Sequence, residues 1–357
     1  MTKKYTFQPD YGVRPGATLK EAIEDRGMSQ SELAARTGIT EKTISQIING
    51  VAPISCNTAD KLELVLGISA GFWNRRELGY RQVVTRQEET AKLAADIAWL
   101  DEIPLRALVA QNYIERTNEK TLLVRRALSF FGVSSVDAWR NFVGNLSTQF
   151  RGKEVHKRKP GYVAAWRRIG VLRAQAIDTQ PFDGEEFKRA LRDVRKLLLR
   201  PARVWVEEVS SRCADAGVAV VFTKAITGAS VSGLARWVKK DKALIQLSLK
   251  YKTEDQLWFT FFHEAGHILL HGKKQIFVDD GISDEGVEER EANKFSRNLL
   301  IPPEFAHRLP HLKSRVKVKA FAKEIGVTPG IVVGRLQNED FLRRNAMNDL
   351  KIKLDFV

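Results

Sequence analysis

The stretch DQLWFTFFHEAGHILLHG, residues 255–272, places His263, Glu264 and His267 in an otherwise apolar segment with helical spacing. On a helix the two histidines lie about 40° apart and about 6 Å along the axis. Both imidazoles can therefore reach one cation at about 2.0–2.1 Å, while Glu264 projects to the side and can take a proton from a water molecule on that cation. The stretch predicts a zinc site, and a pair of structural core histidines is the alternative.

A third metal ligand has to come from outside this helix. The metzincin pattern needs Gly at position 270 and His at position 273, where the sequence has Leu270 and Lys273, so that class is excluded. His271 lies about 12 Å from His263 along the helix axis, which is too far to share one tetrahedral shell. We expect His271 beside the site or at the surface.

The acidic start of the next predicted helix, SDEGVEEREANKFSRNLLIP (283–302), is a better source of the third ligand. If Ala292, Phe295 and Leu299 form its buried stripe, three glutamates fall near the same face, whereas Glu291 falls away from it. Periodicity leaves the choice among these three open. They are Glu285, Glu288 and Glu289.

Short β-rich runs precede the HEAGH segment. Three of them predict a small sheet: VAVVF (218–222), SGLARWV (232–238) and ALIQLS (243–248). The sheet should lead into a helix that starts near Thr253. We expect one of these strands to bind an extended peptide by strand addition. Near the end of the chain, two short helices joined by a Gly-containing turn are predicted by VKAFAKEIGVTPGIVVGRLQ (318–337).

Near the start of the chain the sequence predicts two helices joined by a tight turn. Ser29 can cap the first helix, Gly38 can form the turn, and Thr40 can cap the second helix. The isoleucines of the second helix take its buried side, and they are Ile44, Ile47 and Ile48. The pattern predicts a helix-turn-helix, although periodicity alone also allows an ordinary helical hairpin.

The outward side of that second helix suits the major groove of DNA, where Gln can pair with adenine and Thr or Ser can donate or accept at a base edge. The candidate base readers are Lys42, Thr43, Ser45 and Gln46, with the capping residue Thr40 beside them. Gln30, together with Lys20 or Lys61, is expected to hold phosphates.

The formal net charge of +15 over 357 residues favours an anionic partner such as nucleic acid. Residues 1–85 carry +2 of this excess, residues 86–200 carry +8, and residues 201–357 carry +5. The basic run RGKEVHKRKPGYVAAWRR (151–168) is therefore a candidate nucleic-acid contact, and a solvated helix face is the alternative.

The two cysteines, Cys56 and Cys213, cannot build a disulfide framework or a cysteine-rich zinc site within one chain. This usage is typical of a reducing cytosol. The first residues lack the apolar region of a signal peptide, and the sequence has no run of about 18 apolar residues. We expect a cytoplasmic protein with no membrane contact.

Composition along the chain predicts a multidomain, mostly α-helical protein with one small α+β domain. The predicted parts are an arm at 1–17, a helical bundle at 18–82 whose last pattern ends near Tyr80, a basic and mainly helical middle region at 83–200 interrupted by Pro104, Pro160 and Pro181, a domain at 201–340 with the short sheet and the HEAGH helix, and a tail at 341–357.

Residues 15–80 resemble the XRE-type helix-turn-helix family and, within it, the HigA-like antitoxin regulators. The resemblance rests on PG-x-x-L-K-E, SQ-x-x-L-A-x-x-T-G, T-I-S-x-I-I-N-G and G-I-S-x-x-F-W, all present here. It implies a lambda-repressor-like bundle that binds a double-stranded DNA operator. The family normally does so as a homodimer on an inverted repeat.

Residues from about 200 to 340 resemble the ImmA/IrrE family of zinc-dependent endopeptidases. The resemblance rests on HEAGHILLHG followed by E-x-x-A-N-x-F-S-x-x-L-L-x-P. It implies a gluzincin-like Zn²⁺ site in which Glu289 joins His263 and His267, with Glu264 as the catalytic base. Tyr251 and His271 are candidates for stabilising the oxyanion.

Together the two resemblances imply a transcription regulator whose peptidase domain cleaves a protein substrate such as a repressor or a toxin, in a stress, phage or toxin–antitoxin circuit. Here the helix-turn-helix precedes the peptidase on one chain, which departs from the usual arrangement of the family. The alternative is a transcription factor or antitoxin whose zinc domain is a sensor or scaffold with little proteolysis.

Overall fold

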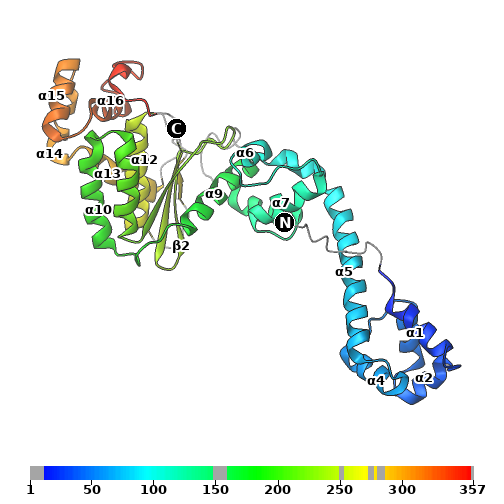
Figure 1. The fold of residues 1–357 in the computed structure, drawn as a ribbon. Coiled ribbons are helices and arrows are strands. Elements are labelled where there is room, and N and C mark those ends of the chain that lie inside the picture. The colour runs from blue at the N-terminus through cyan, green and yellow to red at the C-terminus, as the bar shows by residue number, and fades with distance from the viewer. Residues whose placement is uncertain (1–11, 148–158, 249–252, 272–276, 280–285, 355–357) are drawn as a thin grey trace, which may run out of the picture. The chain divides into compact units, whose positions relative to one another are not determined.

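The computed structural model describes residues 12–147, 159–248, 253–271, 277–279 and 286–354. The chain forms two compact units. The first comprises residues 1–97 with 120–122, and the second comprises residues 98–119 with 123–357. The fold is mostly helical with one small sheet, as the sequence predicts (Figure 1).

The described part of the first unit is a bundle of five helices. They are α1 (Pro15–Glu24), α2 (Gln30–Thr37), α3 (Glu41–Ile48), α4 (Cys56–Leu66) and α5 (Ala70–Ala95). Leu19, Leu33, Ile44 and Trp73 are among the side chains of its core. At Gly16 a Cβ would overlap the carbonyl oxygen of Ile47, so glycine allows α1 to cross α3 closely.

Helix α5 does not end near Tyr80, where the sequence pattern places the end of the bundle, but continues to Ala95. No Gly or Pro interrupts residues 81–95, so nothing in the local sequence stops the helix. The packed part of α5 is nevertheless its first half, which buries Trp73 and Glu77. Glu77 accepts a hydrogen bond from the backbone N–H of Ile54 at 3.1 Å and so fastens the α3–α4 loop to α5.

The second unit begins with helices. Apart from Ile97 and Lys120–Leu122, which belong to the first unit, its first part comprises the 3-10 helix η1 (Ile97–Glu102), α6 (Leu105–Ala110), α7 (Lys120–Phe131), α8 (Val136–Ser147), α9 (Pro160–Gln175), α10 (Gly184–Lys196), the 3-10 helix η3 (Leu197–Leu199) and α11 (Ala202–Ala214). Pro104 and Pro160 stand at helix starts, and Pro181 lies between α9 and α10. The prolines therefore punctuate the middle region as the sequence predicts.

A four-stranded sheet follows in the order β1-β3-β2-β4. Its strands are β1 (Val218–Thr223), β2 (Gly233–Lys239), β3 (Lys242–Ser248) and β4 (Phe277–Asp279). Strand β1 pairs with β3 in parallel, whereas β2 runs antiparallel to both β3 and β4. The three predicted strands are confirmed, and β4 is an addition that the sequence pattern does not predict.

The remaining helices complete the second unit: α12 (Glu254–Leu270), α13 (Val287–Leu300), α14 (Pro303–Ala306), η4 (Leu309–His311), α15 (Arg315–Ile325), α16 (Pro329–Asn338) and η5 (Asn348–Leu350). One face of the sheet packs on α12, and Val220, Ala235 and Ile245 belong to the core that the two share. The other face packs on α9, where Leu244 meets Ala174. The sheet is thus a middle layer between α12 and α9.

Among the described residues, no helix is both long enough and apolar enough to cross a bilayer.

The start of α12 is held by residues near the end of the chain. The backbone N–H of Glu254 donates to the carbonyl oxygen of Ile352 at 3.0 Å, and the N–H of Ile352 donates back to Oε1 of Glu254 at 3.2 Å. Lys351 forms an ion pair with buried Asp255 at 2.7 Å. Burial raises the pKa of Glu254 from its usual value of 4.5 to about 7, although hydrogen bonds to Thr328 and Ile352 oppose this rise.

This raised pKa gives a stability prediction with a defined sign. In the folded chain Glu254 holds its proton up to about pH 7, whereas in the unfolded chain it loses the proton near 4.5. Its contribution to stability is therefore present below pH 4.5 and is lost as the pH rises through 7. Relative to Glu254→Gln, the wild-type free energy of unfolding should fall by up to about 1.4 kcal/mol per pH unit within this window.

Denaturant unfolding of the second unit between pH 5 and 8 measures the effect. Glu207→Gln, at an exposed position on α11, is the control and should follow the wild-type profile. Parallel profiles for wild type and Glu254→Gln would contradict the assignment.

Candidate metal centre and DNA-binding surface

Helix α12 carries the HEAGH residues in its buried part. Glu264 is 0% exposed, and His263 and His267 are each 2% exposed. The helix is buried along most of its length because apolar side chains such as Trp258 and Phe262 flank the polar ones. This largely apolar helix therefore holds the side chains of His263, Glu264 and His267 away from bulk water.

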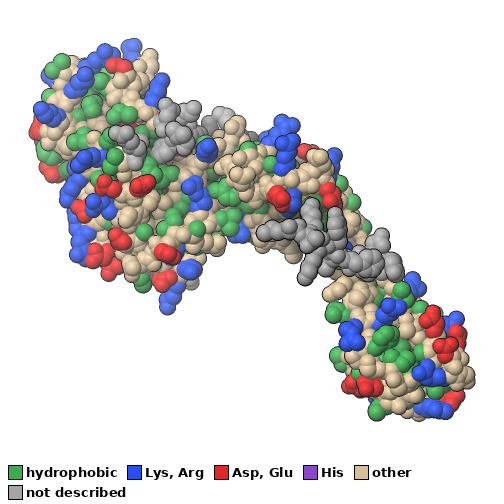
Figure 2. All heavy atoms as spheres, viewed as in Figure 1, with side chains coloured by type: hydrophobic (Ala, Val, Ile, Leu, Met, Phe, Trp, Pro, Cys, Tyr) green, Lys and Arg blue, Asp and Glu red, His purple; other side chains and the backbone are tan. Residues whose placement is uncertain are grey.

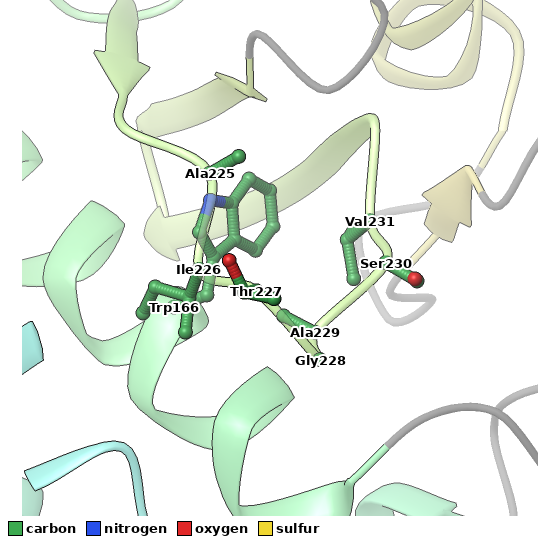
Figure 3. A pocket seen from close by; sticks show the side chains of 8 residues that line it. All are labelled: Trp166, Ala225, Ile226, Thr227, Gly228, Ala229, Ser230 and Val231. Carbon is green, nitrogen blue, oxygen red and sulfur yellow. The ribbon is translucent and has the colours of Figure 1, made fainter.

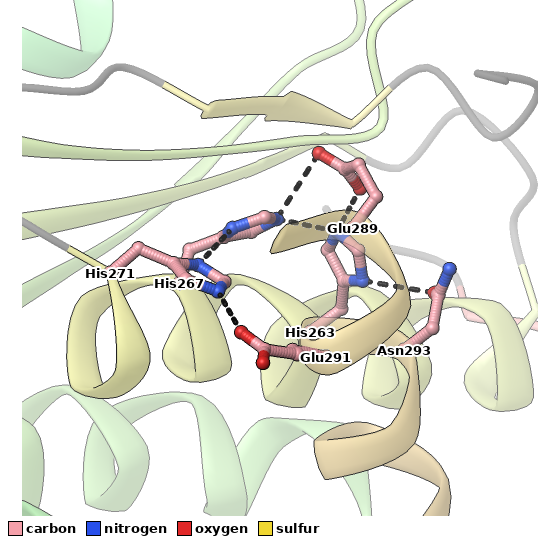
Figure 4. Close-up of polar contacts among 6 residues, drawn as sticks. All are labelled: His263, His267, His271, Glu289, Glu291 and Asn293. Carbon is pink, nitrogen blue, oxygen red and sulfur yellow. Dashed lines mark hydrogen bonds and ion pairs between the residues drawn. The ribbon is translucent and has the colours of Figure 1, made fainter. Parts of the chain in front are cut away.

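Helix α13 brings an acidic side chain, the third candidate ligand, to the two histidines. Oε2 of Glu289 lies 3.2 Å from Nε2 of His263, and Oε1 of Glu289 lies 3.4 Å from Nε2 of His267. The two Nε2 atoms are 3.0 Å apart (Figure 4). A tetrahedron with metal–ligand bonds of about 2 Å has edges of about 3.3 Å, so the donor set and its spacing fit a zinc ion.

The structure shows which of the three candidate glutamates lies next to the two histidines. Glu289 is the one that groups with His263 and His267, their ligand atoms all lying within 4.8 Å of one another. Glu288 is outside this group, and Glu285 lies outside the described residues. Glu291 points away from the group and reaches His271 instead.

A second layer of contacts holds the Nδ1 atoms of both histidines. Oδ1 of Asn293 lies 3.1 Å from Nδ1 of His263, and Nδ1 of His271 lies 2.9 Å from Nδ1 of His267 (Figure 4). Nε2 of His271 lies 3.2 Å from Oε2 of Glu291. Contacts at Nδ1 fix the ring orientation and the tautomer, which leaves Nε2 as the ligand atom.

His271, expected beside the site or at the surface, has its side chain against His267 and is 5% exposed. Asn293 is not among the residues predicted from the sequence. The signal was available, because Asn293 is one helical turn after Glu289 and so shares its face. Tyr251, the other candidate for the oxyanion, lies outside the described residues.

The charges of the group match what a metal requires. Burial lowers the pKa of His267, although the hydrogen bond to Glu289 opposes the shift. For Glu289, burial would raise the pKa, but hydrogen bonds from His263 and His267 outweigh it and hold the pKa well below its usual range. A neutral imidazole and an ionised carboxylate are the forms that bind a metal.

Strand β2 passes directly over Glu264 at Gly233. A Cβ at position 233 would lie 2.5 Å from Oε1 of Glu264, and closer still to Cγ2 of Thr260. The absent side chain is therefore what lets the strand lie against α12. Alternation along β2 turns Ala235 to the same face as Gly233.

Two strands lie at the edges of the described sheet, β4 and β1, so the expectation that a strand within 218–248 binds a peptide stays a prediction. Strand β4 pairs with Gly233–Ala235 of β2, so β4 and not one of the strands within 218–248 holds the outer position on this side. A run of three residues is too short for strand periodicity to reveal. The other edge strand is β1.

The helix-turn-helix of the first unit has the predicted caps. Ser29 Oγ accepts from the N–H of Glu32 at 3.1 Å, and Thr40 Oγ1 accepts from the N–H of Thr43 at 3.2 Å. Gly38 has φ of +67°, the left-handed conformation that ends α2 without strain. Ile44 and Ile47 are buried as predicted, and Ile48 is half-buried.

The predicted DNA-binding residues lie at differing depths. Lys42 is exposed, while Thr43, Ser45 and Gln46 are half-buried on α3. The hydroxyls of Thr40 and Thr43 lie 2.8 Å apart and bond to each other at the cap. Gln30 is the first residue of α2 and is half-buried.

The two lysines expected from the sequence as alternative phosphate contacts, Lys20 and Lys61, both belong to the first unit. Lys20 is exposed on α1 and lies 3.7 Å from Glu24, one turn along the helix. Lys61 is half-buried on α4.

The closing pair α15–α16 has the same local pattern but a different role. Gly326 is left-handed at φ +71°, as Gly38 is, and separates the two helices. Helix α16, however, buries Ile331, Val332 and Leu336 and packs against α12. The second helix of this pair is therefore a core element and has no outward face to insert into a DNA groove.

The basic run 151–168 is only partly within the described residues. Residues 151–158 lie outside them, and Lys159 is exposed. Arg167 is 3% exposed, which contradicts its inclusion in a nucleic-acid contact, because α9 turns this side chain toward the sheet and not outward. Beside it, Trp166 and the loop 225–231 line a shallow pocket that contains none of the predicted site residues (Figure 3).

Comparisons with known proteins agree with both halves of this description. A helix-turn-helix family model matches residues 19–73, and a model of the IrrE N-terminal-like domain, of peptidase family M78, matches residues 213–337. No curated protein matches the chain.

A solved structure of an addiction module antidote protein of the HigA family from Coxiella burnetii is 25% identical over 24% of this chain and 92% of its own, with a TM-score of 0.22. The two family models thus match separate parts of one polypeptide: residues 19–73 are similar to helix-turn-helix domains, and residues 213–337 are similar to the IrrE N-terminal-like domain of peptidase family M78.

Proposed function

We propose that this chain is a DNA-binding transcription regulator whose second unit is a zinc-dependent endopeptidase acting on a regulatory protein. The observation that supports it most is the convergence of His263, His267 and Glu289 on one point, with Glu264 buried on the same helix as the two histidines. A repressor or a toxin is the class of substrate proposed.

When bound by these three ligands, Zn²⁺ would supply a Lewis acid that lowers the pKa of water to about 7 and polarises a carbonyl group. The chain's own residues do the rest. Asn293 and His271 orient the two imidazoles. Glu264 accepts the proton of the attacking water and returns it to the leaving nitrogen of the peptide bond.

An extended substrate can add as a further strand at the outer edge of the sheet. Strand β4 provides this edge next to Gly233, and β2 provides it beyond Ala235. Gly233 lies over Glu264 and β4 is the strand beside it, so a peptide added to β4 would run about two strand spacings, roughly 10 Å, from Gly233. Main-chain hydrogen bonds would supply the affinity, and side-chain contacts the selectivity.

The first unit would bind its operator as a homodimer on an inverted repeat. Helix α3 enters the major groove, with Lys42, Ser45 and Gln46 nearest the bases. The hydroxyls of Thr40 and Thr43 form hydrogen bonds at the helix cap. We therefore propose that these two residues contact phosphates and not base edges. Gln30, at the start of α2, holds the neighbouring phosphate.

Replacing the catalytic base separates proteolysis from metal binding. Glu264→Gln should keep one zinc per chain, because the three ligands are untouched, while cleavage falls at least about 100-fold. Zinc is measured by elemental analysis of the purified chain. Cleavage is measured by mass spectrometry of new peptide termini in cells that express each variant.

Glu288→Gln is the matched control for this experiment, since Glu288 lies on α13 outside the ligand group, and it should retain both properties. Wild-type cleavage by Glu264→Gln would refute the catalytic role. Equal regulation by wild type and Glu264→Gln, with no cleavage by either, would favour the sensor or scaffold function.

Adding one methyl group over the base tests how β2 positions Glu264. Gly233→Ala should cost about 1–3 kcal/mol of unfolding free energy through overpacking and should reduce cleavage, while zinc stays bound. Gly144→Ala on α8, where a Cβ meets nothing within 4 Å, should be neutral or slightly stabilising. Undiminished cleavage and stability in Gly233→Ala would rule out the close approach.

Replacing the side chain of Gln46 tests whether α3 reads base edges. Gln46→Ala should weaken binding to the operator by about 1–3 kcal/mol and leave binding to random-sequence DNA unchanged, because base contacts carry the specificity. The operator is first selected from a random duplex library, and affinity is then measured by fluorescence anisotropy. Gln82→Ala, at an exposed position on α5, should bind as wild type, and equal losses on both DNAs would argue against base reading.

A further inference from the structure

Two arginines lie in the layer between α9 and the sheet. Arg236 pairs with Leu244 in the β2–β3 register, so its side chain is on the α9 face of the sheet, opposite the face that packs on α12. Arg167 lies on α9, and its guanidinium is near enough to that of Arg236 for their charges to interact.

The structure leaves both guanidiniums without a counter-charge among the residues it describes. Nη1 of Arg167 and Nε of Arg236 are fully buried and have no hydrogen-bond partner there. Arg167 is 3% exposed, so water cannot solvate most of its charge. Burying a charge unpaired costs several kcal/mol, and a second like charge beside it adds to the cost.

Two half-buried arginines of the same unit have partners for part of their guanidinium groups. Arg195 donates to the backbone carbonyl oxygens of Leu299, Leu300 and Ile325. Arg335 forms an ion pair with Glu339 at 2.8 Å. For Arg167, burial and then repulsion by Arg236 lower the pKa to about 10, so the side chain remains charged at neutral pH.

We propose that Arg167 and Arg236 form a binding site for a small dianionic oxyanion, of the phosphate class, on the face of the sheet opposite the metal centre. Two guanidiniums match the charge of a dianion, and their planar forks match the spacing of phosphate oxygens. The half-buried Arg236 lies on β2 beyond the residues that β4 covers, which gives the site an open side.

The site is independent of the proposed peptidase function. It requires neither the metal nor the base, and it uses the other face of β2. The two faces nonetheless share a strand, since Gly233 contacts Glu264 and Arg236 is three residues farther along.

Binding of inorganic phosphate to the full-length chain tests the proposal. Calorimetric titration at pH 8 and constant ionic strength, with zinc content matched among samples, should show saturable binding to wild type. Arg167→Met and Arg236→Met should each weaken it at least tenfold. Arg192→Met, at an exposed position on α10, should bind as wild type. Glycerol phosphate in place of inorganic phosphate distinguishes a phosphomonoester from the free ion by its affinity.

Unfolding without phosphate gives a second, independent readout. Because Arg167→Met removes an uncompensated buried charge, its midpoint of thermal unfolding should equal or exceed that of wild type. A midpoint several degrees lower would show that Arg167 has a structural partner and would overturn the proposal. So would equal stabilisation of wild type by chloride, or unchanged phosphate binding in both arginine variants.

Discussion

The close approach of α12 and α13 at Gly266 is the constraint on which the metal centre depends. A Cβ at Gly266 would lie 3.2 Å from Cα of Ala292, and Ala292 itself is fully buried. Small residues on both helices let their backbones come together, and this brings Glu289 to the two histidines of α12. A larger side chain at either position would separate the helices and move a carboxylate that has to be placed within tenths of an ångström.

Features that depend on neighbouring residues could be predicted from the sequence. The caps at Ser29 and Thr40, the left-handed turn at Gly38, and the helical placement of His263 and His267 all follow from spacing over a few residues. Features that depend on how two distant elements meet could not. Periodicity allowed three glutamates on α13, and only the packing of α13 on α12 distinguishes Glu289 from its neighbours. Strand β4 could not be predicted either, because it forms only through pairing with the edge of β2.

The two helix-turn-helix patterns show that a local motif does not fix its own role. In both, a capped helix ends at a left-handed glycine and a second helix follows. The difference lies in the second helices. Helix α3 buries only its isoleucine side, whereas α16 is apolar around most of its circumference and serves as packing for α12. The burial of the second helix therefore decides whether such a motif can reach a partner.

Strand β2 is one wall shared by two chemically different compartments. Because side chains alternate along a strand, Gly233 is on the face of β2 toward Glu264 and Arg236 is on the face toward α9. The pairing of β2 with β3 is regular from Gly233 to Trp237. The irregularity in this pairing falls between Trp237 and Lys239, next to the hairpin. The irregular end of the pairing can accommodate a residue inserted in the hairpin, whereas a residue inserted between Gly233 and Arg236 would exchange the faces and turn the Arg236 side chain toward α12. Insertions near the hairpin end of β2 should therefore be tolerated, whereas insertions near Gly233, at its start, should not.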